Sequence, residues 1–186
     1  LMNIRINGRE ITDHQLMPGT QQYDKRLMVE TIPVEAFLKI GENEIVVALG
    51  NGWYRGSMGN SQEKNVYGDD VALLAQLEIA RKPVCLTDET WQATQNGPIG
   101  LNDFMAGEEY DARLEELCNL HDVKAKDFGY ENLICRDTVP VVPKEIFLAT
   151  WLENPKGEKI LDFGQNLVGY VLLDFEGYAG KKMTLI

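Results

Sequence analysis

The stretch VALLAQLEI, residues 71–79, decides the fold class because it has the clearest strand pattern in the chain. Apolar residues occupy every second position from Val71 to Ile79, and the polar Gln76 and Glu78 fall between them. This two-residue period is typical of a strand with one face buried and the other in solvent. We therefore predict a half-buried β-strand here.

Outward from this strand, short apolar runs are separated by turn residues in both directions. Asn7-Gly8 predicts a type I′ hairpin, because both central residues of that turn need a positive φ. Residues 44–49 contain a continuous apolar run after Glu44, typical of a strand covered on both faces. Since strands dominate and helical patterns are scarce, we expect an all-β fold. Its expected architecture is a jelly-roll β-sandwich of two antiparallel sheets packed face to face.

The composition excludes several classes of function. The net charge of −11 argues against nucleic acid and anionic membrane surfaces as partners, because both call for clustered basic residues. No apolar run approaches the roughly 20 residues that a membrane-spanning helix needs. The three cysteines, Cys85, Cys118 and Cys135, show no paired spacing, which predicts reduced, buried thiols and a cytoplasmic location.

The pattern changes near residue 136, where we place a domain boundary. Before it, Asp111 to Lys124 is the best helix candidate, with Asp111 as its N-cap and His121 on the same face as Leu114. After it, a proline-rich extended stretch leads to four predicted strands, at residues 146–152, 159–163, 168–175 and 182–186. We expect a first domain over 1–136, with its first strand missing, and an incomplete second β-sandwich over 137–186.

The run Asn51-Gly52-Trp53-Tyr54-Arg55 is the first candidate site. The glycines around Asn51 let the backbone turn sharply, so the run is predicted to be a loop. A sugar ring has an apolar face that stacks on an aromatic ring and hydroxyls that need hydrogen-bond partners. Asn51 and Arg55 are the predicted partners, and Trp53 or Tyr54 the stacking ring. In the alternative interpretation the loop is structural and a mostly buried Trp53 closes one end of the core.

A second polar run extends from Gly107 to Arg113. Strand alternation would put Glu109, Asp111 and Arg113 on one face and Glu108 and Tyr110 on the other, so that a carboxylate and an arginine can form a bidentate pair. Such a pair is either a polar clasp inside the fold or one rim of a sugar site that includes Glu108 and Asp111.

Two further polar pairs, Asp69 with Asp70 and Asn102 with Asp103, are weak candidates for a calcium ion. Adjacent carboxylates in a turn are more often only solvated, and no other cofactor is indicated. The sequence gives no specific pair of acids for glycosidase chemistry, so no catalytic residue is assigned.

These motifs, in their order along the chain, resemble the N-terminal domain of bacterial α-L-rhamnosidases of glycoside hydrolase family 78. The resemblance rests on the following motifs: Ile6 to Arg9, Pro18-Gly19, Gly41 to Asn43, Gly52 to Gly56, Tyr67 to Asp69, Leu73 to Leu77 and Gly107 to Arg113. Asp162 to Tyr170 resembles the signature of the next β-sandwich domain in these enzymes.

The resemblance implies a galactose-binding-like jelly roll followed by a second β-sandwich. It also implies catalysis by a separate α/α barrel further along the chain, and in some members a domain like the first binds L-rhamnose with calcium. We therefore expect a non-catalytic fragment that recognises rhamnose-containing glycosides or supports the catalytic domain downstream in the same chain. Two alternatives are a purely structural module without sugar affinity and a complete small glycosidase that uses the acids of residues 108–111.

Overall fold

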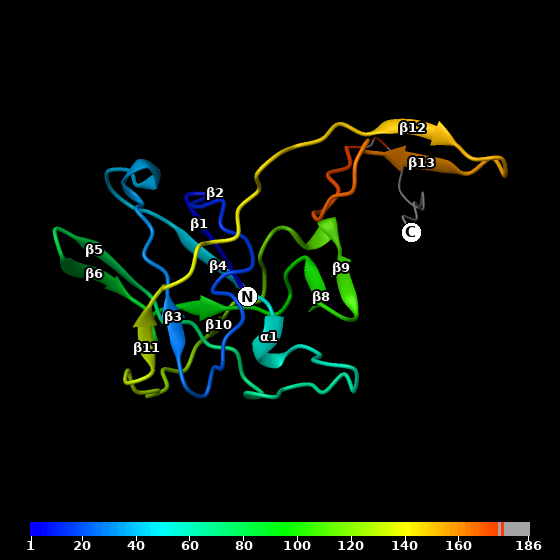
Figure 1. Cartoon of the computed structure of the whole chain (residues 1–186). Helices are drawn as coiled ribbons and strands as arrows, with labels where there is room; N and C mark the ends of the chain where they lie inside the picture. Colours follow the sequence, from blue (N-terminus) through cyan, green and yellow to red (C-terminus); the bar gives the residue numbers. More distant parts are fainter. Residues whose placement is uncertain (175, 177–186) are drawn as a thin grey trace. The chain divides into compact units, whose positions relative to one another are not determined.

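The computed structural model describes residues 1–174 and 176, and nearly all of its regular structure is β (Figure 1). The chain divides into two units, Leu1–Pro143 and Lys144–Ile186. Three helical segments occur in the described part, none of them long and apolar enough to cross a membrane. The elements in chain order are β1 Met2–Ile6, β2 Arg9–Glu10, β3 Leu27–Val29, η1 Glu35–Phe37, β4 Ile45–Leu49, α1 Gly52–Arg55, β5 Gln76–Ile79, β6 Lys82–Leu86, β7 Gln92–Ala93, β8 Ile99–Asp103, β9 Gly107–Tyr110, η2 Ala112–Leu114, β10 His121–Asp122, β11 Leu133–Cys135, β12 Thr150–Glu153 and β13 Lys159–Asp162.

A three-stranded sheet with the order β2-β1-β4 lies at the start of the first unit. The β1–β2 turn is formed by Asn7 and Gly8, with φ values of 51° and 76°, which confirms the predicted left-handed turn. β4 pairs along β1 in antiparallel register from Met2 opposite Leu49 to Ile6 opposite Ile45. The prediction that the run at residues 44–49 is covered on both faces is wrong for the described residues, because the side chains of β4 are half-buried or exposed.

The remaining strands of the first unit pair two by two, and most of the pairs are antiparallel. The predicted strand at 71–79 is shorter than expected, since β5 covers only its second half. The alternation itself is present, with Leu73, Ala75 and Leu77 half-buried between exposed neighbours. β3 and β11 pair in parallel, with Leu27 opposite Leu133, and so join the beginning of the unit to its end.

The helix predicted over Asp111 to Lys124 is wrong. Only the single turn η2 and the short strand β10 occur there. The Asp111 side chain does cap the turn, because it accepts a bond from the Arg113 backbone N–H at 3.0 Å. Asn119 then adopts φ = 52°, a left-handed conformation that a helix interior does not accommodate. His121, predicted on a helix face, instead lies in β10 opposite Ala93.

The prediction of buried thiols is also wrong. Cys118 and Cys135 are exposed, Cys85 is half-buried, and all three are free thiols. In the second unit, β12 and β13 form an antiparallel hairpin at two of the predicted strand positions. Residues 168–174 contain no strand, and the strand predicted at 182–186 lies outside the described residues, as does Phe175.

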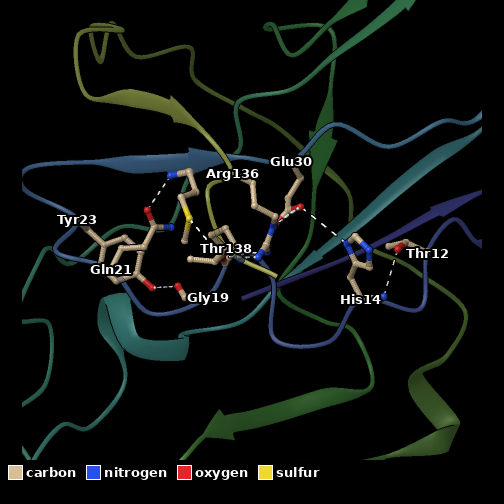
Figure 2. A network of polar contacts seen from close by, with 10 residues as sticks. Thr12, His14, Gly19, Gln21, Tyr23, Glu30, Arg136 and Thr138 are labelled. Carbon is tan, nitrogen blue, oxygen red and sulfur yellow. Dashed lines mark hydrogen bonds and ion pairs between the residues drawn. The ribbon is translucent and has the colours of Figure 1, made fainter. Parts of the chain in front are cut away.

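The first unit contains a partly buried ion pair between Glu30 and Arg136, just after β3 and β11 (Figure 2). The Glu30 side chain is 5% exposed and that of Arg136 17%. Arg136 Nε donates to both Glu30 carboxylate oxygens, at 2.8 and 2.9 Å, and Nη1 donates to Thr138 Oγ1 at 3.0 Å. His14 Nδ1 lies 3.9 Å from Glu30 Oε2 on the other side of the carboxylate. This network ties residues from the two ends of the unit together.

Candidate functional site

The first candidate run follows the sheet directly and forms a helix of one turn, α1, rather than the predicted loop. Gly52 begins this helix with φ = 51°, and a Cβ there would meet atoms of Leu1 at 2.8 Å, so the position favours glycine. Arg55 N–H donates to the Asn51 carbonyl at 3.1 Å, which closes the turn. The short helix after β4 instead separates the side chains of Trp53 and Tyr54, since Trp53 contacts Phe104 and Tyr54 contacts Tyr67.

Trp53 packs against Phe104, a residue that the sequence did not single out. The ring centroids are 4.4 Å apart and the planes are tilted by 34°. Trp53 is half-buried, so the prediction of a mostly buried side chain overestimates its burial, and Phe104 is 45% exposed. The pair joins α1 to the tip of the β8–β9 hairpin, which lies beside α1 in Figure 1.

Tyr54 belongs to a cluster of three tyrosines with Tyr23 and Tyr67. The Tyr54 ring stacks on Tyr67 at 6.2 Å and meets the edge of Tyr23 at 5.5 Å. Burial, and secondarily the neighbouring Tyr67, raises the pKa of Tyr23 to about 12. Tyr23 donates its hydroxyl to the Gly19 carbonyl at 2.7 Å. These contacts give Tyr54 a structural role in the described part of the chain.

Asp103 fixes the hairpin tip to the residues that follow α1. Its Oδ2 accepts bonds from Ser57 N at 2.8 Å and Ser57 Oγ at 3.0 Å. Its Oδ1 accepts bonds from the backbone N–H groups of Met105 at 2.9 Å and Ala106 at 3.1 Å. The bonds from Ser57 and from Met105 hold the pKa of Asp103 at about 2. A calcium ion bound to the Asp103 carboxylate would have to displace hydrogen bonds that the carboxylate already accepts.

The other candidates for calcium are spread over the surface. Asp69 and Asp70 are exposed. Asn102 is half-buried and donates through Nδ2 to Glu108 Oε2 across the hairpin, at 3.4 Å. Within residues 1–174, no three side chains of His, Cys, Asp or Glu lie close enough together to hold a metal ion.

The second candidate run begins in β9 and ends in η2. The predicted bidentate pair is present, since Arg113 Nε donates to Asp111 Oδ1 at 2.8 Å and Nη2 donates to Oδ2 at 2.5 Å. It lies at the surface, with the Arg113 side chain 88% exposed, so it is not a clasp inside the fold. These bonds hold the pKa of Asp111 at about 2. Asp111 therefore remains ionised and already paired at neutral pH.

The hairpin register separates the two acids that were predicted to share a sugar site. Glu108 lies opposite Asn102 near the tip, whereas Asp111 follows the far end of β9, where Tyr110 is opposite Ile99. Trp53 thus contacts Phe104 at the tip of the hairpin, and Glu108 pairs with Asn102 in the strands that lead to this tip. No pattern in the sequence indicated the contact between Trp53 and Phe104, which lie on different elements.

A family model and individual relatives identify one and the same protein family for this chain. A family model described as "Alpha-L-rhamnosidase N-terminal domain" matches residues 1–133. A protein of Streptomyces avermitilis named "Alpha-L-rhamnosidase" is 32% identical over 200 residues, covering 100% of this chain and 19% of that protein. A protein of the same name from Formosa agariphila is 33% identical over 119 residues, covering 62% of this chain and 13% of its own length.

A solved structure is similar over most of the chain. The crystal structure of native α-L-rhamnosidase from Aspergillus terreus matches with a TM-score of 0.79 and 34% identity, over 90% of this chain and 21% of that chain. This likeness, with the strand-rich structure, confirms the expected all-β sandwich fold. The chain spans about a fifth of the length of the relatives that match nearly all of it.

Proposed function

Because this chain belongs to the family of the α-L-rhamnosidase N-terminal domain, as its ordered motifs predict, we propose that it is a non-catalytic module of a longer rhamnosidase. The longer protein would hydrolyse terminal α-L-rhamnose from glycosides. The observation that carries the proposal is the family match over residues 1–133, together with relatives about five times as long as the chain. The module's partners would be rhamnose-containing glycosides and the catalytic domain downstream in the same chain.

The two strongly hydrogen-bonded acids near the candidate site are unsuited to act as a general acid. Hydrolysis with inversion needs a general acid with a raised pKa and a second carboxylate across a cleft. Asp103 and Asp111 have lowered pKa values instead, because hydrogen bonds stabilise their ionised forms. Both carboxylates therefore serve as acceptors that hold the local structure.

Carbohydrate recognition is the second part of the proposal, and one observation favours it. The exposed ring of Phe104 packs on Trp53 at the tip of the hairpin in which Asn102 and Glu108 pair. The rival is a purely structural module, supported by the packing of Trp53 and Tyr54 against other aromatic rings. We also propose that residues 137–186 are the start of a second β-sandwich domain. A cytoplasmic location is supported by the three free cysteines.

The assay for the non-catalytic role is incubation of the purified 186-residue chain with an aryl α-L-rhamnoside. We expect no turnover, while a full-length relative releases the chromophore under the same conditions. Turnover by the pure chain that disappears in Glu108→Gln or Asp111→Asn would refute the proposal and favour a small complete glycosidase.

A further inference from the structure

We propose that Asn96, in the loop between β7 and β8, is the site at which this chain undergoes spontaneous deamidation. The chain contains three Asn-Gly pairs, Asn7-Gly8, Asn51-Gly52 and Asn96-Gly97. An asparagine before a glycine is prone to this reaction, because the glycine has no Cβ to hinder the approach of its backbone nitrogen to the asparagine side chain. The contacts of the three pairs differ, and they leave only Asn96 free to react.

The reaction uses two groups of the chain and one water molecule. The Gly97 backbone nitrogen forms a bond to Cγ of Asn96, and the bond between Cγ and Nδ2 breaks. Nδ2 leaves as ammonia and takes the proton that the Gly97 nitrogen has lost, so a five-membered succinimide ring remains. Water then adds to one of the two ring carbonyl carbons and opens the ring to aspartate or to isoaspartate.

Asn96 meets the conditions for this attack. It is exposed, and its backbone N–H donates to Thr94 Oγ1 at 3.0 Å. Its side-chain amide has no hydrogen-bond partner within residues 1–174, and the Gly97 N–H donates to no group in that range either. Neither reacting group therefore has to break a hydrogen bond before the ring closes.

Asn7 is held in the β1–β2 turn by its own side chain. Its Nδ2 donates to the Phe37 carbonyl and to Asn43 Oδ1, both at 2.9 Å. Its Oδ1 accepts a bond from the Glu44 backbone N–H at 3.2 Å. Ring closure at Asn7 has to break these bonds first, so we expect it to be about tenfold or more slower than at Asn96.

Asn51 is protected by the backbone of α1 and by the packing of its glycine. Its φ of −59° and ψ of −45° are helical, and its carbonyl accepts the bond from Arg55 N–H that closes the turn. Gly52 is buried, and a Cβ there would meet atoms of Leu1 at 2.8 Å. Ring closure would have to move the Gly52 nitrogen out of this packed position, so Asn51 should stay intact while Asn96 reacts.

Deamidation of Asn96 affects the hairpin because the residues that follow lead directly into β8. The Pro98 carbonyl accepts a bond from the Asp111 N–H at 2.8 Å, and Ile99 is opposite Tyr110. Isoaspartate lengthens the main chain by one methylene group just before these contacts. The modified chain should therefore lose pairing first at the open end of the β8–β9 hairpin, and it has one more negative charge than the unmodified chain.

The test is incubation of the 186-residue chain at mildly alkaline pH, followed by peptide mass spectrometry and ion-exchange separation. The mass increase from replacing the amide by a carboxylate should appear first in the peptide that contains Asn96, and its rate should rise with pH. In urea, where the fold is absent, the three Asn-Gly peptides should react at similar rates. Asn96→Gln should abolish the early product, because a glutamine has to close a larger ring.

Gly97→Ala is the matched variant that changes the attacking residue. A Cβ at Gly97 meets only Leu117, at an ordinary contact distance of 3.8 Å, so the variant should unfold at the wild-type midpoint and deamidate severalfold more slowly. Equal rates at Asn96 and at either other pair in the folded chain, or no product at Asn96, would overturn the proposal. A folded Gly97→Ala chain that reacts as fast as the wild type would do the same. So would a faster reaction of Asn96 in urea, because the local sequence and not the fold would then explain the order.

Discussion

Replacing Arg136 with methionine is expected to reduce the free energy of unfolding of the first unit by about 3–5 kcal/mol. The substitution leaves the Glu30 carboxylate, 5% exposed, without its counter-charge. Hydrogen bonds to charged groups contribute about 1.5–3 kcal/mol each, and Arg136 Nε alone donates to both Glu30 oxygens. Loss of these bonds is therefore large enough to account for the whole range.

Urea unfolding followed by tryptophan fluorescence measures this effect. The double variant Glu30→Leu/Arg136→Met should recover most of the loss, because replacing a buried pair by apolar side chains removes both desolvated charges. Arg113→Met is the matched control. It also breaks a bidentate arginine–carboxylate pair, but one with an 88% exposed arginine, so its unfolding midpoint should stay unchanged. If Arg136→Met stayed within about 1 kcal/mol of the wild type, the pair would behave like an exposed one and the reasoning would fail.

Three further predictions follow from the site. Trp53→Ala should destabilise the chain by less than the roughly 3–5 kcal/mol typical of a fully buried tryptophan, because Trp53 is half-buried, and a denaturation midpoint equal to that of the wild type would contradict its packing on Phe104. The pKa of Asp103 in the folded state, about 2, lies below its ordinary value of 3.8, so its contribution to stability is present above about pH 4 and is lost as the pH falls toward 2. Melting temperatures over that interval should fall less steeply in Asp103→Asn than in the wild type, and equal slopes would argue against this assignment. The pH dependence contributed by Tyr23 has the opposite sign, because its pKa is raised to about 12. Tyr23 therefore stabilises the fold below pH 10, and this contribution is lost as the pH rises from 10 to 12. Absorbance titration of Tyr23→Phe against the wild type would detect the shifted pKa.

Local features of the fold could be predicted where residues close together in the sequence determine the structure. The left-handed Asn7-Gly8 turn and the alternation before Leu77 are of this kind. The helix predicted after Asp111 failed because its apolar spacing was considered without Asn119, whose left-handed backbone is incompatible with a continuing helix. Amphipathic spacing thus predicted a helix in a segment where the left-handed conformation of Asn119 prevents one.

The candidate site could be predicted only in part, because its key contacts join residues far apart in the sequence. Trp53 was recognised from its own neighbourhood, but its partner Phe104 lies on a different hairpin. Asp103 was considered as a ligand for calcium, and its role as an acceptor for Ser57 depends on a contact 46 residues away. No periodicity or motif in a single sequence predicts such pairings.

The parallel pairing of β3 with β11 determines when the domain can finish folding. Glu30 and Arg136 are 106 residues apart, so the chain must close a very long loop before the pairing can stabilise it. On the ribosome, Glu30 would remain hydrated until Arg136 emerges, and the unit should fold late and cooperatively rather than strand by strand. A protein cut at residue 133, where the family match ends, would lack both Arg136 and Val141, which bridges to Gln15. The smallest piece able to fold should therefore extend at least to residue 141, about eight residues past the family boundary.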